Sequence, residues 1–448
     1  MIKTPRGMSV EILNRVELKD AYAEPLLDAF LSAHYLPNIH DRRLLTELVY
    51  GTLRMKGHLD WLIGKYYRGD FLSLNSTVKN ILRTALYQLI YTNRIPVFAV
   101  VDEAVKLAKS LHPGSEALVN ALLRNYLRKK DELICPRKEE DPLEHISVLH
   151  SHPGWLVKRW LESFGVEGTI ALCRANNEAP PVALRVNRLK VTREKAIDEL
   201  KEEGIEARKT VFSPDGLVIT ENAPSLRKAA SFMKGHIQVQ DEASQMIARL
   251  AAPRPGERIM DSCAGTGVKA THLAELMENK GKILAIDINE KKLLALQKLA
   301  ERLGIGILET RVGDATAGMG SSLYNGFDRI LVDAPCSGLG TLKRNPEIKW
   351  RLALGDIKAF AELQGKILES SALCLKEGGI IVYSVCTVMP EENEGVIETF
   401  LRHHGDFRLL PPPGSIDCRL IDERGFFRTS PDRHGTDGFF AAVMVRKG

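Results

Sequence analysis

The chain has 448 residues, of which 44% are hydrophobic and 27% charged, as in a soluble globular protein of two to four domains. It starts without an apolar stretch of signal-peptide length, and no run of about 18 apolar residues follows, so we expect a cytoplasmic protein without a membrane segment. Its seven cysteines include no C-x-x-C pair, which argues against a zinc site and favours free thiols in a reducing compartment.

Positive charge is concentrated in residues 51–130, which carry 13 basic and five acidic side chains, whereas the whole chain has a net charge of only +5. A basic face of this kind attracts phosphate backbones without reading their sequence, so the charge favours a nucleic-acid partner. A well-solvated helical surface is the alternative interpretation. The basic residues are Arg54, Lys56, Lys65, Arg68, Lys79, Arg83, Arg94, Lys106, Lys109, Arg124, Arg128, Lys129 and Lys130.

Residues 1–140 are predicted to form an all-α domain. Apolar residues recur at spacings of three and four through "DRRLLTELVYGTLRMKGHLDWLIGKYY" and again through "STVKNILRTALYQLIYTN", where Ser76 or Thr77 can cap the helix. Two further helical stretches, 97–112 and 116–130, follow without an intervening strand pattern. The polar segment "CPRKEEDPLEH", which contains two prolines, is the best candidate for a linker.

Residues 141–240 change to a mixed pattern. An amphipathic helix in "HPGWLVKRWLESFG" precedes a short strand in "ALRVN" and a helix in "TREKAIDELKEEG". Two more short strands are expected in "GLVIT" and "HIQVQ". This pattern predicts a small α+β domain that links the helical domain to the rest of the chain.

Strands and helices alternate regularly through residues 241–448. The expected strands lie in "ERIMDS", "KILAIDI", "ILETRVGD", "FDRILVDAP" and "GGIIVYSVCT", and the tail "GFFRTSPDRHGTDGFFAAVMVRK" is predicted to be a final hairpin. Strands separated by helices form a parallel sheet whose ligand loops gather at the carboxyl ends of the strands. The fold class is therefore multidomain, with a C-terminal Rossmann-like α/β domain.

The loop "MDSCAGTGVKA" at 260–270 fits two kinds of cofactor site. As G-x-G-x-x-A it matches a dinucleotide-binding turn, and as D-x-C-A-x-x-G-x-K it looks like a methyl-donor loop that lacks two of its usual residues. Both kinds need a glycine turn after the first strand and an acid after the second, where Asp287 can bind ribose hydroxyls. The loop alone leaves both alternatives open.

The later strand ends separate these alternatives. Asp314 ends the third strand, where a carboxylate can accept a hydrogen bond from an adenine amino group. Asp333 and Cys336 end the fourth strand, and Cys386 ends the fifth. Hydride transfer to a nicotinamide needs no pair of thiols, whereas thiols at two neighbouring strand ends indicate covalent chemistry.

Several motifs resemble, in order, those of the RNA cytosine-5 methyltransferases of the Nop/Sun family. They are "VQDEASQ", the 260–270 loop, "AIDINEKK", "GDAT", "DRILVDAPCSGLGTLKRNPEIKW" and "YSVCTVMPEENE". The predicted N-terminal helical domain contains "ELVYGTL", "VDEAV" and "VNALLRN". It looks like the NusB-like RNA-binding domain of the bacterial Sun (Fmu, RsmB-type) subgroup. The resemblance covers nearly the whole chain. It implies a class I methyltransferase domain, S-adenosylmethionine as cofactor and 16S (small-subunit) ribosomal RNA as substrate.

The resemblance also implies roles for the residues at the strand ends. Cytosine C5 is a poor nucleophile, and a thiolate that adds to C6 turns C5 into an enamine carbon that can attack a methyl group. The resemblance assigns this thiolate to Cys386 and assistance in release to Cys336, and Asp333 could hydrogen-bond the cytosine N3 and N4 edge. The alternatives are a buried core cysteine, a small turn residue and a helix cap, respectively.

The resemblance also assigns ten residues to the methyl-donor site, and seven of them form the loop 263–269. Family members usually have A-P-G-G-K in this loop, where Thr266 and Val268 replace the proline and the second glycine. A valine at a backbone position with positive φ would be strained, whereas one with negative φ costs little. A turn or an N-cap is the alternative role for the two acids that end the second and third strands. The residues are Cys263, Ala264, Gly265, Thr266, Gly267, Val268, Lys269, Asp287, Asp314 and Asp333.

Side chains beyond the fourth strand are further candidates for RNA contact. Lys343, Arg344 and Lys349 are expected to hold phosphates near the target base. Trp350 and Tyr383 fit core packing better than stacking on a base. We also interpret Cys173 and Cys374 as packing residues and Cys135 and Cys418 as loop residues.

Two other functions stay open at this point. One is an RNA-binding assembly factor with a weakened donor site, although such a protein needs no pair of thiols. The other is a nicotinamide-dependent oxidoreductase, which rests on the 260–270 loop alone. A monomer is expected, since nothing in the sequence demands a higher assembly.

Overall fold

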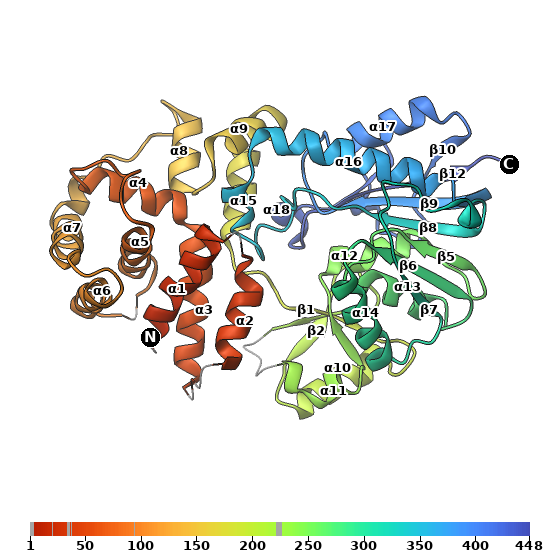
Figure 1. Ribbon diagram of the computed structural model, residues 1–448, viewed down its shortest axis with the longest axis horizontal. Coiled ribbons are helices and arrows are strands. Elements are labelled where there is room, and N and C mark those ends of the chain that lie inside the picture. Colours follow the sequence, from red (N-terminus) through yellow and green to blue (C-terminus); the bar gives the residue numbers. More distant parts are fainter. Residues whose placement is uncertain (1–3, 20, 34–35, 37, 94, 221–225) are drawn as a thin grey trace. The chain divides into compact units, whose positions relative to one another are not determined.

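The computed structural model describes residues 4–19, 21–33, 36, 38–93, 95–220 and 226–448 (Figure 1). The chain divides into two compact units, one formed by Met1–Glu178 with Leu342–Ala353 and the other by Ala179–Thr341 with Leu354–Gly448. The expected domains 1–140, 141–240 and 241–448 stay a prediction. The two compact units have other bounds than these three domains. The helices between 142 and 177 belong to the first unit and the linking strands to the second.

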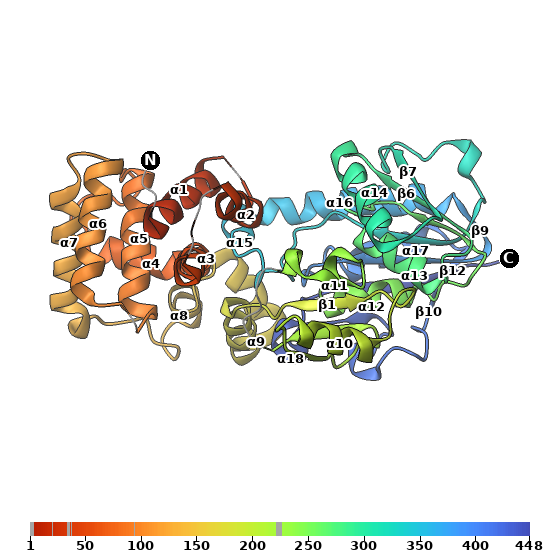
Figure 2. The same ribbon diagram turned by 90° about the horizontal axis from the view of Figure 1, so that it is seen from below.

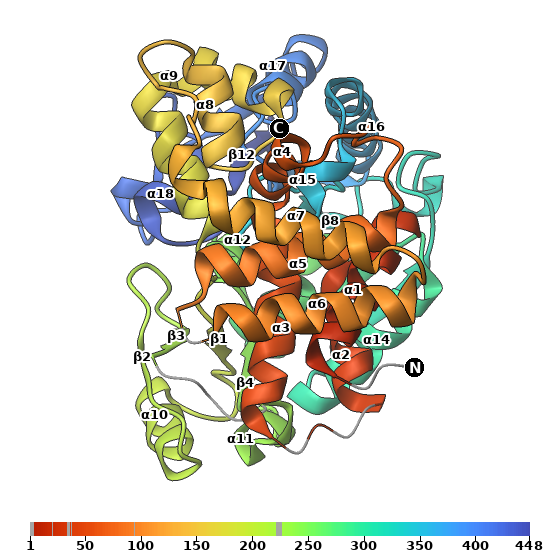
Figure 3. The same cartoon turned by 90° about the vertical axis from the view of Figure 1, so that its left-hand side faces the viewer.

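The first unit is helical, as the sequence predicts. Its helices are α1 (Pro5–Leu18), α2 (Ala23–Ala33), α3 (Ile39–Arg54), α4 (Lys56–Tyr66), α5 (Ser76–Tyr91), α6 (Val97–Leu111), α7 (Glu116–Lys129), α8 (Pro142–Leu149), α9 (Gly154–Asn177) and α15 (Ile348–Arg351). Figures 2 and 3 show α5, α6 and α7 side by side, and their apolar faces enclose one core with residues of α4. Helix α15 comes from the segment 342–353, which is distant in sequence from the others.

Helix α5 shows how the local sequence sets a helix boundary. Its N-cap is Asn75, whose side-chain oxygen accepts a hydrogen bond from the Thr77 amide at 2.8 Å. Ser76 and Thr77 are already helical, so the expectation that one of them caps the helix is wrong. Asparagine is as good a cap as serine, and the helix simply begins one residue after it.

The basic segment 51–130 is only partly a surface. Arg54 and Arg83 are buried, and the Lys56 side chain is 22% exposed. Arg83 pairs with Asp60 at 2.5 Å and with Glu17 at 3.0 Å, because a buried guanidinium needs partners. The expectation of a phosphate-binding role is therefore wrong for Arg54 and Arg83, and Arg94 lies outside the described residues. The exposed basic residues are Lys65, Arg68, Lys106, Lys109, Arg124, Arg128, Lys129 and Lys130.

The linking part of the second unit contains a four-stranded antiparallel sheet in the order β2-β3-β1-β4. Three strands confirm the prediction, namely β1 (Ala183–Val186), β3 (Gly216–Ile219) and β4 (Ile237–Val239). The sequence did not indicate β2 (Ala207–Lys209), a short and largely exposed edge strand. Helices α10 (Arg193–Glu202) and α11 (Ala230–Met233) pack against this linking sheet.

The rest of the second unit is an eight-stranded sheet covered by helices on both faces. The strands are β5 (Arg258–Asp261), β6 (Lys282–Asp287), β7 (Leu308–Val312), β8 (Phe327–Asp333), β9 (Leu375–Val385), β10 (Phe407–Leu410), β11 (Phe427–Arg428) and β12 (Phe440–Arg446). The helices are α12 (Glu242–Leu250), α13 (Val268–Leu276), α14 (Glu290–Leu303), α16 (Leu354–Ala372), α17 (Glu394–His403) and α18 (Pro431–His434). Figure 1 shows α12, α13 and α14 on one face of the sheet and α16 and α17 on the other. None of the helices that the structure describes is long and apolar enough to cross a membrane.

The topology of this sheet predicts where a ligand binds. Its order is β10-β12-β9-β8-β5-β6-β7, with β5 to β9 parallel and β12 antiparallel to β9. The five parallel strands and the final hairpin of β11 and β12 confirm the prediction from the sequence. The chain moves from β5 to β7 on one side and returns to β8 on the other, so the strand order reverses between β5 and β8. Ligands bind at such a reversal, outside the carboxyl ends of the strands.

Candidate active site

A cavity of about 490 Å³ lies at the carboxyl ends of the parallel strands. Its volume falls within the range of small-ligand sites. Loops after β5, β6, β7, β8 and β9 all contribute to its lining. The structure thus brings into one cavity the acids and thiols that the sequence distributes over separate strand ends. The predicted site residues that line it are Cys263, Gly265, Asp287, Asp314, Asp333, Cys336 and Cys386.

Two glycines shape the loop after β5. Gly267 has a φ of 82° and is the N-cap of α13, and a Cβ added there would lie 2.2 Å from Leu296 Cγ, so only glycine fits. Gly265 has a φ of 55° and borders the cavity. Thr266 and Val268 both avoid positive φ, and Val268 is the first residue of α13. The two departures from the family pattern therefore introduce no backbone strain.

Two acids border the cavity after β6 and β7. Asp287 accepts hydrogen bonds from the amides of Gly265 at 2.9 Å and Asn289 at 2.8 Å, so it fixes the glycine loop. Each of its oxygens can accept another hydrogen bond, for example from a ribose hydroxyl. Asp314 is exposed and accepts from the amide and hydroxyl of Thr316, which hold the pKa of Asp314 below its usual value. The alternative role considered for Asp314, a turn residue, therefore applies. Asp314 also lines the cavity, so the two roles do not exclude each other.

Asp333 is held from two sides. It accepts a hydrogen bond from Lys269 Nζ at 2.7 Å and from Ser384 Oγ at 2.8 Å. Burial opposes the charge on Lys269, but the Asp333 carboxylate outweighs burial and raises the pKa of Lys269, with a smaller contribution from Cys386. Lys269 is therefore a fixed positive charge close to one of the thiols. Burial and the negative charge of Asp333 raise the pKa of Asp261, at the end of β5, to about 7.

The two thiols lie side by side at the ends of β8 and β9. The Sγ atoms of Cys336 and Cys386 are 3.3 Å apart, and both free cysteines are partly exposed and line the cavity. A hydrogen bond with Cys386, together with burial, raises the pKa of Cys336 well above its usual value. At this separation both sulfur atoms can reach neighbouring atoms of one small planar ring. Neither cysteine is therefore explained by core packing alone.

Glu392 joins the two cysteine loops, and the sequence analysis gave it no role. Its buried carboxylate accepts hydrogen bonds from Ser337, next to the first thiol, through the amide at 2.8 Å and Oγ at 2.5 Å. It also accepts from Thr387 Oγ1, next to the second thiol, at 3.1 Å, and from Gln364 Nε2 at 2.9 Å. Burial raises the pKa of Glu392. The sequence did offer a signal for Glu392, because this acid lies within the quoted motif "YSVCTVMPEENE", shortly after a buried strand.

Comparisons with known proteins place the chain in a family. The NusB family model matches residues 3–128, the RsmF/B-like ferredoxin-like domain matches 152–225, and the 16S rRNA methyltransferase RsmB/F model matches 248–445. A probable ribosomal RNA small subunit methyltransferase B from Bacillus subtilis (strain 168) is 36% identical over 452 residues and covers 99% of both chains. The chain belongs to the RsmB/F methyltransferase family. The motif resemblance is thereby confirmed.

Solved structures confirm the fold of this RsmB/F methyltransferase. The crystal structure of PH0851 has a TM-score of 0.85 and 30% identity, and covers 99% of both chains. The structure of NSun6 from Pyrococcus horikoshii, determined with SFG, has a TM-score of 0.61 and 25% identity. It covers 67% of this chain and 100% of the NSun6 chain. The fold class is therefore a NusB-like helical domain, a ferredoxin-like linking domain and a C-terminal methyltransferase domain.

Some predicted residues of this RsmB/F protein lie outside the cavity. Lys269 reaches Asp333 with its side chain, and Gly267 packs against α14 instead of a ligand. The amide of Ala264 donates to the Ile286 carbonyl at 2.8 Å and ties the loop to β6. The residues of the loop that do not border the cavity are Ala264, Thr266, Gly267, Val268 and Lys269.

The expected phosphate contacts are wrong for Lys343 and Lys349. Both side chains are buried in the first unit, where Lys349 Nζ donates to the Arg54 carbonyl at 3.0 Å. Burial lowers the pKa of Lys349 to about 7. Trp350 Nε1 donates to the Leu53 carbonyl at 2.7 Å, which confirms a packing role. The positive charge of Lys343 and Lys349 suggested that both side chains are exposed. The sequence does not show that the segment 342–353 packs among the helices of the first unit.

Proposed function

We propose that this protein transfers a methyl group from S-adenosylmethionine to C5 of a cytosine in 16S ribosomal RNA, through a covalent bond between Cys386 and C6. The observation that carries the proposal is the pair of thiols in one cavity, with Sγ atoms 3.3 Å apart. Methylation of an oxygen or nitrogen atom needs no thiol, whereas attack by C5 needs a nucleophile at C6 and a base at C5. The names of the relatives support ribosomal RNA as the substrate.

The residues around the cavity fit the methyl donor, which supplies an electrophilic methyl group when bound. Asp287 can accept from ribose hydroxyls, and Asp314 from the adenine amino group. Ile288 is apolar yet 70% exposed, which suits a surface that an adenine covers. SFG, present in the NSun6 structure, is an analogue of this donor and supports the assignment.

In the proposed reaction the Cys386 thiolate adds to C6, while the Asp333 carboxylate faces the N3 and N4 edge of the base and accepts a hydrogen bond from the N4 amino group. The electron pair of C5 forms the bond to the methyl carbon, and S-adenosylhomocysteine leaves. Cys336 then removes the C5 proton, and the electrons of that C–H bond restore the C5–C6 double bond and expel the Cys386 thiolate. Lys269 stabilises the thiolate as a nearby positive charge. The cytosine must leave its stack so that both ring faces are accessible.

Methylation of purified RNA tests the proposal directly. Purified protein, methyl-labelled S-adenosylmethionine and unmodified small-subunit ribosomal RNA are expected to yield 5-methylcytidine. The measurement is mass spectrometry of the digested nucleosides, which separates this product from cytidines methylated at N3 or N4. Label only on another atom or another base would contradict the proposal.

Ligand binding separates the other two functions. We expect calorimetry to show binding of S-adenosylhomocysteine and none of NAD, because the two adjacent thiols suit covalent attack on a base and hydride transfer to a nicotinamide does not require them. An assembly factor with a weakened donor site would bind neither ligand. Binding of NAD without S-adenosylhomocysteine would exclude the proposed methyltransferase.

A Glu392→Gln variant is expected to be less stable by about 2 kcal/mol, because an amide nitrogen would face a buried donor. The four hydrogen bonds that this carboxylate accepts span both cysteine loops. We also expect methylation to slow by about tenfold, since the thiols lose their fixed separation. Urea unfolding and methylation kinetics measure the two effects. A Glu398→Gln variant, which breaks a half-exposed ion pair of α17 with Arg424, serves as control. Equal behaviour of both variants would refute the role of Glu392.

A further inference from the structure

Arg185 is a charged residue in the middle of a fully buried strand. It lies on β1 of the linking sheet, where all four residues are buried, and its own side chain is 0% exposed. Removing a guanidinium from water is costly unless its donors are paired, so its partners must be specific. None of these partners belongs to the cysteine loops described above, and the reaction as proposed so far does not use Arg185.

Four of the five hydrogen bonds that Arg185 donates go to one helix that packs on the methyltransferase sheet, and the fifth joins Nη1 to Gln240 Oε1, next to β4. Nη1 donates to the Val268 carbonyl at 2.7 Å, at the start of α13. Nη2 donates to Thr271 Oγ1 at 3.1 Å, one turn later. Nη2 and Nε donate to the two carboxylate oxygens of Glu275, at 2.8 and 3.1 Å, near the end of the helix. One guanidinium therefore fixes both the position and the rotation of α13.

The start of α13 is the end of the donor loop. Gly267 is its N-cap, and Thr271 Oγ1 donates back to the Gly267 carbonyl at 2.8 Å. Val268, whose carbonyl Arg185 holds, is followed directly by Lys269, and Lys269 Nζ reaches Asp333 at 2.7 Å. A shift of this turn would therefore move both the loop that borders the cavity and the cation near the thiols.

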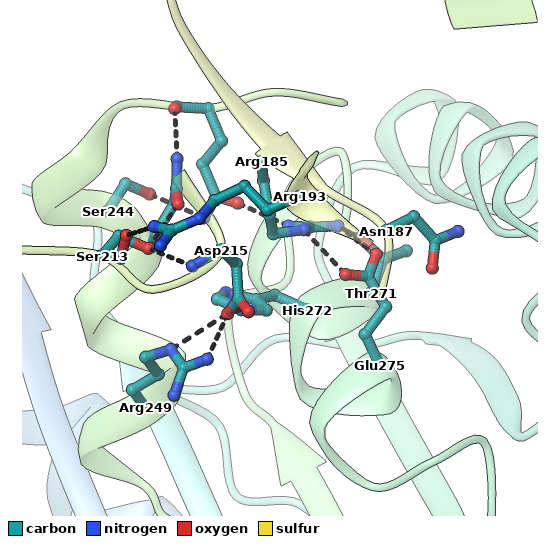
Figure 4. Close-up of polar contacts among 12 residues, drawn as sticks. Arg185, Asn187, Arg193, Ser213, Asp215, Ser244, Arg249, Thr271, His272 and Glu275 are labelled. Carbon is teal, nitrogen blue, oxygen red and sulfur yellow. Dashed lines mark hydrogen bonds and ion pairs between the residues drawn. The ribbon is translucent and has the colours of Figure 1, made fainter. Parts of the chain in front are cut away.

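A second polar group from the linking part reaches the same helix (Figure 4). Asp215, next to β3, lies 3.2 Å from His272 Nε2 of α13 and accepts from Arg249 Nε of α12 at 3.0 Å. Burial lowers the pKa of His272 to about 4, so this histidine is neutral. Asp215 secures the middle of the helix, and only Arg185 reaches the first residue of α13 among the described side chains of the linking sheet.

We propose that Arg185 is a positioning residue for the methyl-donor loop, through which the linking sheet sets the start of α13 and the direction of Lys269. The linking domain then does more than connect two parts of the chain, because it completes the support of the donor site. The proposal rests on the donor role of the 263–269 loop given above. Arg185 itself is fully buried and does not line the cavity.

An Arg185→Lys variant tests the proposal. Lysine keeps the charge opposite Glu275, but its ammonium has three donors on one nitrogen, whereas Arg185 donates five hydrogen bonds from three nitrogens. The matched control is Arg329→Lys, because Arg329 is also buried and also pairs with a carboxylate, Glu257, and a backbone carbonyl. The hydrogen bonds of the Arg329 side chain go to Glu257 and Ala251 and not to α13, so we expect its substitution to affect stability alone.

The deciding measurement is hydrogen exchange of the backbone amides in 263–272, without any ligand. We expect faster exchange in Arg185→Lys than in Arg329→Lys, and a Kd for S-adenosylhomocysteine raised about tenfold in the first and less than about twofold in the second. Glu275→Gln, which keeps the shape of the side chain but removes the ion pair with Arg185, is expected to change exchange in the same direction, and it serves if Arg185→Lys does not fold.

The possible failures are distinguishable. Equal exchange of this segment in the wild type, Arg185→Lys and Glu275→Gln would overturn the positioning role of Arg185. Loss of S-adenosylhomocysteine binding to the same degree in Arg185→Lys and Arg329→Lys would also overturn it, since both effects would then follow from stability. Wild-type protein that binds no S-adenosylhomocysteine would instead overturn the proposed methyltransferase function.

Discussion

A Cys386→Ala variant is expected to lose methyl transfer by more than about 10³-fold, because removal of a covalent nucleophile costs an enzyme several orders of magnitude. Without the thiolate, C5 of cytosine stays a poor nucleophile even when the methyl donor is bound. Binding of S-adenosylhomocysteine should be retained, since the acids that border the donor half of the cavity are unchanged. Single-turnover methylation and calorimetry on the same preparation measure both properties.

Cys374→Ala is the matched control for this variant. Cys374 is buried in the core of the same unit, and burial raises its pKa to about 11, so it is a protonated packing residue. Its loss should lower stability slightly and leave the methylation rate within a few-fold of wild type. Full activity of Cys386→Ala would remove the proposed nucleophile. Equal losses in both variants would show that the effect arises from folding.

The fold could be predicted from the sequence wherever a local pattern decides it. Apolar residues with helical spacing marked the first unit, and apolar strands between helices marked β5 to β9. The missed strands β2 and β10 are short or lie at a sheet edge, where half-exposed residues give no clear alternation. The sequence also did not show that 342–353 packs among the helices of the first unit, because that depends on contacts between distant segments.

The candidate site was predictable for a topological reason. Parallel strands end at one edge of a sheet, so the sequence alone predicts that Asp287, Asp333, Cys336 and Cys386 lie close together, and all four line the cavity. The structure then showed that the departures from the family loop pattern have ordinary backbone angles. The loop was ambiguous as a motif, and the thiols at two later strand ends are what favour a methyl-donor site.

The residues that support the site were not predictable in the same way. Arg185 and Glu392 are both fully buried charges, and each connects segments that are far apart in the sequence. A sequence shows that such a residue is charged, but its burial and its partners follow only from the tertiary structure. Buried charges with several partners are therefore the features for which the structure adds most to the sequence.

A Cys336→Ala variant is expected to accumulate a covalent protein–RNA adduct, because the C5 proton then lacks its base and the bond between Cys386 and C6 cannot break. The adduct should appear as a slowly migrating, RNA-labelled band on a denaturing gel. The double variant Cys336→Ala/Cys386→Ala is the control and should show no such band. If the single variant also shows none and turns over normally, Cys336 has no role in release.

The contact between the thiols explains how Cys336 could become a base at the right stage. Its pKa is raised first by the hydrogen bond with Cys386, next by burial and then by the negative charge on Cys386. Once Cys386 is bonded to C6, its sulfur carries neither a proton nor a charge, so the first and third causes disappear and the pKa of Cys336 falls. Cys336 is then deprotonated more readily when a base is required. In Cys386→Ala, the pH midpoint for alkylation of Cys336 by iodoacetamide should therefore lie below that in wild-type protein, and an unchanged midpoint would contradict this coupling.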